Sequence, residues 1–213
     1  NYTVEGAKPT THYVPRFRNV LSQETDFLRG YAAGFGARKI MKYNTSGLGN
    51  ELHDNLMDSG EGDAWSVRSH MMGETIPKEE NQVSLDENLV DAWGIPQLKV
   101  AVDYDENDEK MLKDFFDEFS EMYRKAGFTN IQTIDNNRIP GNDIHEMGGV
   151  RMGHDPKTSL LNKWNQLHHC QNVFVTDGAC MTSTSTQNPS LTYMALTARA
   201  ANFAVKELKK MNL

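Results

Sequence analysis

The sequence predicts an α+β fold, in which an antiparallel sheet carries packed helices and a closing strand–helix unit belongs to a second sheet. Three observations predict it. Residues 64–104 contain strand patterns separated by Pro and Gly, and a strongly amphipathic helix pattern follows at 106–126. Residues 172–213 then join a short apolar run to a long helical pattern of different character.

Composition and charge exclude several classes of protein. The 213 residues suffice for one large domain or for one and a half. The net charge of −7, with Lys and Arg scattered, argues against a nucleic-acid partner. No apolar run approaches the roughly 20 residues that span a bilayer, so we expect a soluble chain. The two cysteines, Cys170 and Cys180, cannot form a disulfide framework and leave the compartment, cytoplasmic or periplasmic, undecided.

Residues 1–62 are expected to be irregular. Segments 13–19 and 30–36 contain aromatic residues, the second together with Gly, which suggests extended chain and close-packed turns. The Gly-containing segment 44–63 is typical of a loop with one short helical turn around 51–57. So little periodicity is unusual for the start of a self-contained domain.

Strand patterns begin at residue 64. Residues 65–72 alternate between apolar and polar, 82–85 form a short run, and 98–104 place their apolar residues on one face. These patterns predict antiparallel strands with one solvated face. A further short strand is expected at 130–134.

One long helix is predicted between Asp105, a suitable N-cap, and Gly127, a suitable C-terminal residue. Apolar residues recur there at steps of three and four. They are Leu112, Phe115, Phe116, Phe119, Met122, Tyr123 and Ala126. This stripe predicts core packing.

The closing unit contains a strand, a polar loop and a helix. Residues 173–175 form a continuous apolar run, which is typical of a strand buried on both faces. Asn188 fits the N-cap of the helix and Pro189 its first position. The predicted buried stripe consists of Leu191, Met194, Ala195, Ala198, Ala201, Asn202, Val205 and Leu208. A strand, a loop and a helix N-terminus together favour an anion-receiving site.

Two side chains are candidates for chemistry. His145 precedes a Gly pair in segment 143–156, and imidazole is the side chain best suited to accept a proton near neutral pH. Spacing alone favours a packing or loop histidine. Asn188 has two interpretations as well: it caps the helix, or it holds a substrate oxygen at the helix terminus.

No metal site is predicted. The segment His168-His169-Cys170 lies downstream of two further histidines, but its spacing matches no zinc finger or ribbon. Cys180 follows the predicted strand with no base placed near it by sequence, so we expect no reactive thiol there.

Two segments together carry a family resemblance. They are His145-x-x-Gly-Gly-x-Arg-Met-Gly153 and the sequence from Asn172-Val-Phe-Val-Thr-Asp-Gly178 through Asn188-Pro-Ser-Leu-Thr-Tyr-Met-Ala-Leu196 to Arg199-Ala-Ala201. In order and spacing they resemble the C-terminal part of the glucose-methanol-choline (GMC) flavoprotein oxidoreductases. Segments 73–77, 81–86 and 91–96 are similar to those that precede this part in the family.

The resemblance implies that His145 is the catalytic histidine and that Asn188 is the second catalytic residue. The positions that it implies in contact with FAD are Asp177, Gly178, Asn188, Pro189 and Ser190. The sequence differs from the family pattern at two positions. Gly149 occupies a position where Thr is frequent, and Thr182 one where Pro is frequent. Both leave the proposed acid–base pair intact.

The resemblance also implies a division of the chain. Residues 1–62 form a lead-in with cap loops, 63–144 a substrate-domain sheet with its helix, and 145–213 the catalytic loop with the last strand–helix unit of an FAD domain. Family members begin with a glycine-rich βαβ unit that grips FAD, and this sequence lacks it. We therefore expect the chain to need that missing N-terminal portion as a partner, and alone to bind FAD poorly and to be inactive.

The implied activity is oxidation of an alcohol, such as a sugar or polyol, by hydride transfer to flavin N5. His145 takes the hydroxyl proton, and Asn188 hydrogen-bonds the developing alkoxide. The electron acceptor is not indicated. One alternative is a non-catalytic small-molecule binding module of the same fold. Another is a Ser/His/Asp hydrolase, although no G-x-S-x-G motif occurs.

Overall fold

The computed structural model describes residues 12–58, 60–137 and 139–213. Its helices are α1 (Asn50–Met57), α2 (Glu106–Lys125) and α3 (Ser190–Lys209), and a short 3-10 helix, η1, spans Gly178–Cys180. Its strands are β1 (His12–Val14), β2 (Tyr31–Lys42), β3 (Gly60–Gly73), β4 (Gln82–Val90), β5 (Pro96–Ala101), β6 (Gln166–Leu167) and β7 (Cys170–Phe174). The coarse prediction of an α+β fold with antiparallel sheets is confirmed.

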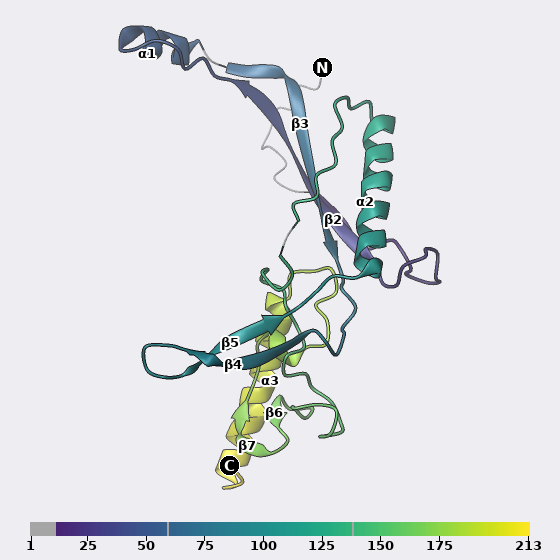
Figure 1. Ribbon diagram of the computed structural model, residues 1–213, viewed down its shortest axis with the longest axis vertical. Helices are drawn as coiled ribbons and strands as arrows, with labels where there is room; N and C mark the ends of the chain where they lie inside the picture. The colour runs from purple at the N-terminus through teal and green to yellow at the C-terminus, as the bar shows by residue number, and fades with distance from the viewer. Residues whose placement is uncertain (1–11, 59, 138) are drawn as a thin grey trace.

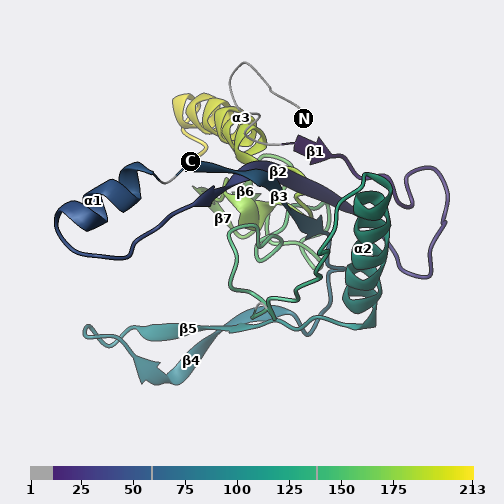
Figure 2. The same ribbon diagram turned by 90° about the horizontal axis from the view of Figure 1, so that it is seen from above.

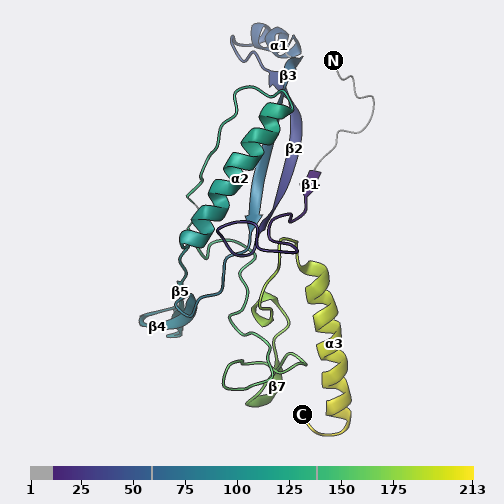
Figure 3. The same cartoon turned by 90° about the vertical axis from the view of Figure 1, so that its right-hand side faces the viewer.

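The largest sheet has the order β1-β2-β3, with both pairs antiparallel. Strands β2 and β3 form a long ribbon, and α1 lies at its far tip (Figure 1). Helix α2 runs along one side of this ribbon, whereas α3 and the β6–β7 pair occupy the opposite end of the molecule (Figures 1 and 3). The hairpin β4–β5 projects away from both (Figure 2).

The core lies between α2 and the β1–β2–β3 sheet. Its buried members are Phe27, Tyr31, Ala33, Met111, Phe115 and Phe119. The ring of Phe115 meets Tyr31 edge-on at a centroid distance of 5.8 Å and lies 4.6 Å from the ring of Phe119. The helix predicted at 106–126 is therefore confirmed in its position. Its predicted stripe is confirmed in part, since Phe115 and Phe119 are buried whereas Met122 and Ala126 are exposed. Met111, which the predicted stripe did not include, is also buried. Asp105 is its N-cap and forms a capping box with Asp108.

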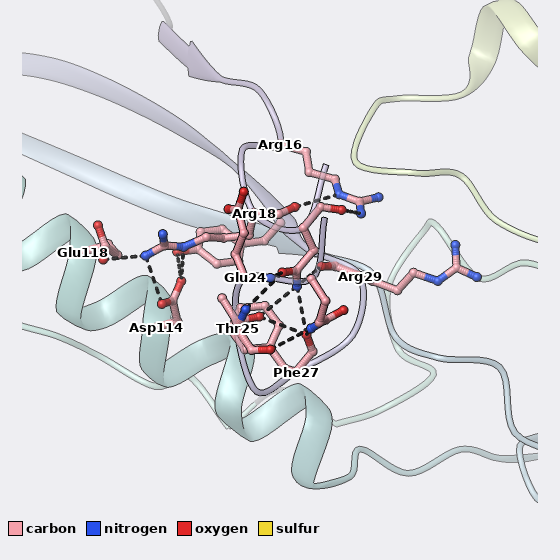
Figure 4. A network of polar contacts seen from close by, with 11 residues as sticks. Arg16, Arg18, Glu24, Thr25, Phe27, Arg29, Asp114 and Glu118 are labelled. Atoms are coloured by element: carbon pink, nitrogen blue, oxygen red, sulfur yellow. Dashed lines mark hydrogen bonds and ion pairs between the residues drawn. The ribbon is translucent and has the colours of Figure 1, made fainter. Parts of the chain in front are cut away.

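A polar network ties the loop between β1 and β2 to α2 (Figure 4). Arg18 pairs with Asp114 at 2.9 Å and with Glu118 at 2.5 Å. The Tyr31 hydroxyl donates to Asp114 at 2.6 Å. Burial, reinforced by this carboxylate, raises the pKa of Tyr31 well above its usual value, so the phenol remains a donor. Asn19 closes the loop by donating to the carbonyls of Phe27 and Arg29, each at 2.8 Å.

The expectation of an irregular lead-in is wrong for β2, because residues 31–42 form a strand of 12 residues. Its small residues hide the alternation that reveals a strand. Close packing favours a glycine at position 34, since an added Cβ would lie 2.4 Å from Cε1 of His70 on β3. The helical turn expected around 51–57 is confirmed as α1. The rest of the lead-in includes residues 1–11 and 59, which lie outside the described residues.

Strands β4 and β5 are antiparallel, as expected, but the expectation that one face is buried is wrong for this hairpin. Cross-strand partners Leu85 and Leu98 are 62% and 66% exposed. The reason is that β4 and β5 form a sheet of only two strands among the described residues. The expected strand at 130–134 is also absent, because Asn130 adopts a left-handed φ of 58° that interrupts an extended chain.

The closing unit pairs β6 with β7 and packs α3 against them. Phe203 of α3 stacks on Trp164 at 4.9 Å and meets Phe174 edge-on at 6.3 Å. Two expectations are wrong here. Val173 is 38% exposed although its strand was expected to be buried on both faces, since β7 has one partner strand. The predicted apolar stripe of α3 is also exposed, because the helix packs through the opposite face that carries Phe203.

Candidate active site

The loop that follows His145 runs beside the turn that follows β7. The Val150 N–H donates to the carbonyl of Ala179 at 2.9 Å, and the Met152 N–H donates to that of Cys180 at 3.1 Å. These two bonds join segments that are almost thirty positions apart in the sequence. The structure thus brings together the two segments in which the candidate residues were predicted.

The first turn of α3 joins the same place. Tyr193 donates from its hydroxyl to Met147 Sδ at 3.6 Å, and its N–H donates to the carbonyl of Pro189 at 3.0 Å. Gly178 lies beneath this contact, where an added Cβ would be 2.8 Å from Met147 Sδ and 2.9 Å from Tyr193 Oη. Burial, and then the charge of Asp177, raise the pKa of Tyr193, so its hydroxyl stays protonated.

Gly178→Ala should therefore disturb the site, because the new methyl group must displace Met147 and Tyr193. Overpacking of this kind costs roughly 1–3 kcal/mol. Gly149→Ala is the matched control, since no atom lies within 4 Å of an added Cβ there. Urea unfolding should show a loss of stability for Gly178→Ala and a change within about 0.5 kcal/mol for Gly149→Ala. Equal midpoints for the two variants would contradict this account of Gly178.

His145 lies two residues before Met147, and its side chain is half-buried. Asn188 lies one residue before the cap of α3 and is exposed. Within the described ranges, neither side chain has a protein hydrogen-bond partner, so the two are not bonded to each other. The structure places their segments together and leaves both side chains available to a further group.

The expectation that Asn188 is the N-cap is wrong. The cap of α3 is Pro189, with φ −92° and ψ 6°, and no side chain accepts from the first turn. The physical reason is that the helix begins one residue later than predicted, so the Asn188 amide lies beyond reach of the capping position. Asp177 has a local role, since its carboxylate accepts from the Ala179 N–H at 3.0 Å and caps η1.

A buried asparagine, Asn165, links the end of β7 to helix α3. Asn165 is 0% exposed, and its side chain donates to the carbonyl of Val175 at 3.0 Å and accepts from Arg199 at 2.9 Å. Arg199 also reaches Met152 Sδ at 3.5 Å. Asn165 and Tyr193 were not predicted from the sequence, because their partners Arg199 and Met147 lie 34 and 46 positions away. The only local indication was the polar turn of which Asn165 is part.

The histidines and cysteines beside β6 and β7 have ordinary partners or surroundings. His168 Nε2 lies 3.2 Å from Ser159 Oγ. No three His, Cys, Asp or Glu side chains gather as a metal site in the described part of the chain. Cys180 is buried, which raises the pKa of its thiol and disfavours the reactive thiolate.

No helix within the described ranges is long and apolar enough to cross a bilayer.

Comparison with known proteins identifies the class. The family model described as GMC oxidoreductase matches residues 77–197. The 2-methyl-1,2-propanediol dehydrogenase of Mycolicibacterium austroafricanum is 31% identical over 84% of this chain and 34% of its own length. The fructose dehydrogenase large subunit of Gluconobacter japonicus is 31% identical over 88% of this chain and 35% of that protein. The gluconate 2-dehydrogenase flavoprotein of Pantoea cypripedii is 29% identical over 60% of this chain and 22% of that protein.

These matches define the family of the chain. It belongs to the GMC oxidoreductase family, which confirms the resemblance stated from its motifs. The chain spans about a third of the length of the first two relatives, 34% and 35% respectively.

Proposed function

We propose that this chain is the C-terminal catalytic and substrate portion of an FAD-dependent alcohol oxidoreductase. The observation that carries the proposal is the meeting of three segments: the loop after His145, the turn at Gly178 and the first turn of α3. His145 and Asn188 stand at the edges of this meeting place with no protein partner for their polar atoms among the described residues. An imidazole suits proton transfer, and a carboxamide suits oxyanion binding.

The residues present fit a flavin. Helix α3 begins without a side-chain cap, so the N–H groups of its first turn remain available, and the helix dipole favours negative charge there. Asp177, Gly178, Asn188, Pro189 and Ser190 would hold the group. When bound, FAD accepts the hydride that leaves the substrate carbon. The helix dipole is worth typically about 0.3–1 kcal/mol toward negative charge at this end.

His145 takes the proton of the substrate hydroxyl in this proposal. Its half-buried side chain has no partner that would fix its proton, so it can act as a general base. Asn188 donates from its amide to the developing alkoxide, a contact that strengthens as negative charge grows on that oxygen.

The apolar surface of the closing unit supports a missing partner. Helix α3 leaves Leu191 78%, Met194 68% and Leu208 61% exposed, although its other face is packed. An apolar helix face is normally covered by another element, and α3 has a second apolar face that is exposed. We propose that the FAD-binding portion covers this face and supplies the sheet that β7 and α3 join. The chain alone then binds FAD poorly.

The names of the relatives support a substrate class. Their names specify a diol, a sugar and a sugar acid, each of which carries a CH–OH group. We propose a small alcohol of this kind, a sugar or polyol, as the substrate.

The test is anaerobic reduction of the flavin in a full-length protein that contains this chain. Addition of diols, ketohexoses or aldonic acids in turn should bleach the visible flavin absorbance with at least one of them. The control is the 213-residue chain purified alone, which should retain no flavin. Bound flavin that no alcohol reduces would instead indicate a non-catalytic binding module. Tight flavin binding by the chain alone would contradict the proposed division.

A further inference from the structure

The loop that leads into Asn188 is tied to Tyr13 of strand β1 and to Glu74, which follows strand β3. Residues 183–187 connect the turn after η1 to α3, and they carry no regular structure. The N-terminal end of α3 lies beside the end of the β2–β3 ribbon (Figures 1 and 3). One side chain from the sheet and one from the residue that follows it contact the loop, one at each end.

Glu74, the residue after β3, holds the start of the loop. Its carboxylate accepts from the Ser183 hydroxyl through Oε1, and the same oxygen pairs with Arg29 Nη1 at 3.6 Å. The Glu74 side chain is only 10% exposed, so these partners replace the water that its carboxylate loses on burial. Ser183 Oγ in turn accepts from the Ser185 N–H at 2.8 Å, and Ser185 is held at a left-handed φ of 58°. The carboxylate therefore fixes the bend of the loop through one hydroxyl.

Tyr13, on β1, holds the end of the loop. Its hydroxyl donates to the carbonyl of Thr186 at 2.7 Å and accepts from Gln187 Nε2 at 2.9 Å. Thr186 is buried, and Pro189 is buried two residues after Gln187. Asn188 is thus anchored on both sides while its own side chain stays exposed.

We infer that Glu74 is a positioning residue, which holds Asn188 over the substrate oxygen through Ser183 and the loop 183–187. This inference rests on the proposed function, in which Asn188 binds the developing alkoxide. Glu74 touches no reacting atom in this scheme. Its effect is to keep the Asn188 amide in one place, because a misplacement of about 1 Å in a reacting group can lower a rate roughly 10²-fold.

The experiment compares Glu74→Ala and Ser183→Ala with the wild type in the full-length protein. The first readout is amide hydrogen exchange, by mass spectrometry, of peptides that cover residues 183–188. Loss of the tie should speed this exchange about tenfold. The second readout is alcohol oxidation, in which kcat should fall about 10–100-fold with little change in KM, because the Asn188 contact forms in the transition state. Ser183→Thr keeps the hydroxyl and should restore both values.

Glu79→Ala is the control, since Glu79 is exposed and close in sequence to Glu74. It should change neither readout. Unchanged exchange of 183–188 in both Glu74→Ala and Ser183→Ala would overturn the inference. So would a fall in kcat that Ser183→Thr fails to restore. A wild-type protein whose flavin no alcohol reduces would overturn the proposed function, and the exchange measurement would still decide whether Glu74 holds the loop.

Discussion

His145→Ala is expected to slow flavin reduction by alcohol roughly 10²–10⁴-fold in the full-length protein, the range typical of a lost general base. The side chain has no protein hydrogen-bond partner within the described ranges, and it lies two residues from the contact between Met147 and Tyr193. Its removal should therefore leave the surrounding packing intact. Stopped-flow measurement of the flavin absorbance under anaerobic conditions gives the rate directly.

The matched control is His154→Ala, because His154 belongs to the same segment and is exposed. It should reduce its flavin at the wild-type rate. A His145→Ala rate equal to that of the wild type would remove His145 from the proposed role.

Elements with an uninterrupted local pattern were predicted well from the sequence. Helix α2 has an N-cap, a C-terminal glycine and an apolar stripe that all agree, and most of that stripe, centred on Phe115 and Phe119, packs in the core. Strand β3 alternates along most of its predicted length and pairs with β2. In these cases each local preference points to the same structure.

Elements that depend on a distant partner were not predicted well. Strand β2 has small residues instead of an alternating pattern, and its pairing with β1 and β3 makes it a strand. For α3 the sequence indicated one apolar stripe, but the helix is apolar on more than one side, and the described contacts use the face that contains Phe203. Periodicity alone cannot say which of two apolar faces meets which neighbour.

The candidate site shows the same division. The family motifs located His145, Gly178 and Asn188, and the structure brings their segments together. The cap of α3 was misplaced by one residue, since Asn and Pro are both favoured near helix starts and their exact positions depend on tertiary contacts. Neither Tyr193 nor Glu74 could be found from spacing, because each acts through a partner that is distant in the chain.

Phe115→Ala should lower the free energy of unfolding by about 3–5 kcal/mol, which is typical of truncating a buried aromatic residue. Phe115 is 7% exposed and packs between Tyr31 of β2 and Phe119 of α2. The variant would leave a cavity between the helix and the sheet. Domains of this kind are stable by only about 5–15 kcal/mol, so the loss should lower the urea midpoint markedly.

Met122→Ala is the control on the same helix, because Met122 is 37% exposed and lies outside the buried cluster. It should change the free energy of unfolding by about 0.5 kcal/mol or less. The β2–β3 ribbon would lose its main support in Phe115→Ala, and with it the base from which Glu74 and Tyr13 reach the loop before Asn188. Hydrogen exchange in residues 183–188 should therefore also rise in Phe115→Ala and stay unchanged in Met122→Ala. An equal effect of the two variants on unfolding would mean that α2 is not held to the sheet through Phe115.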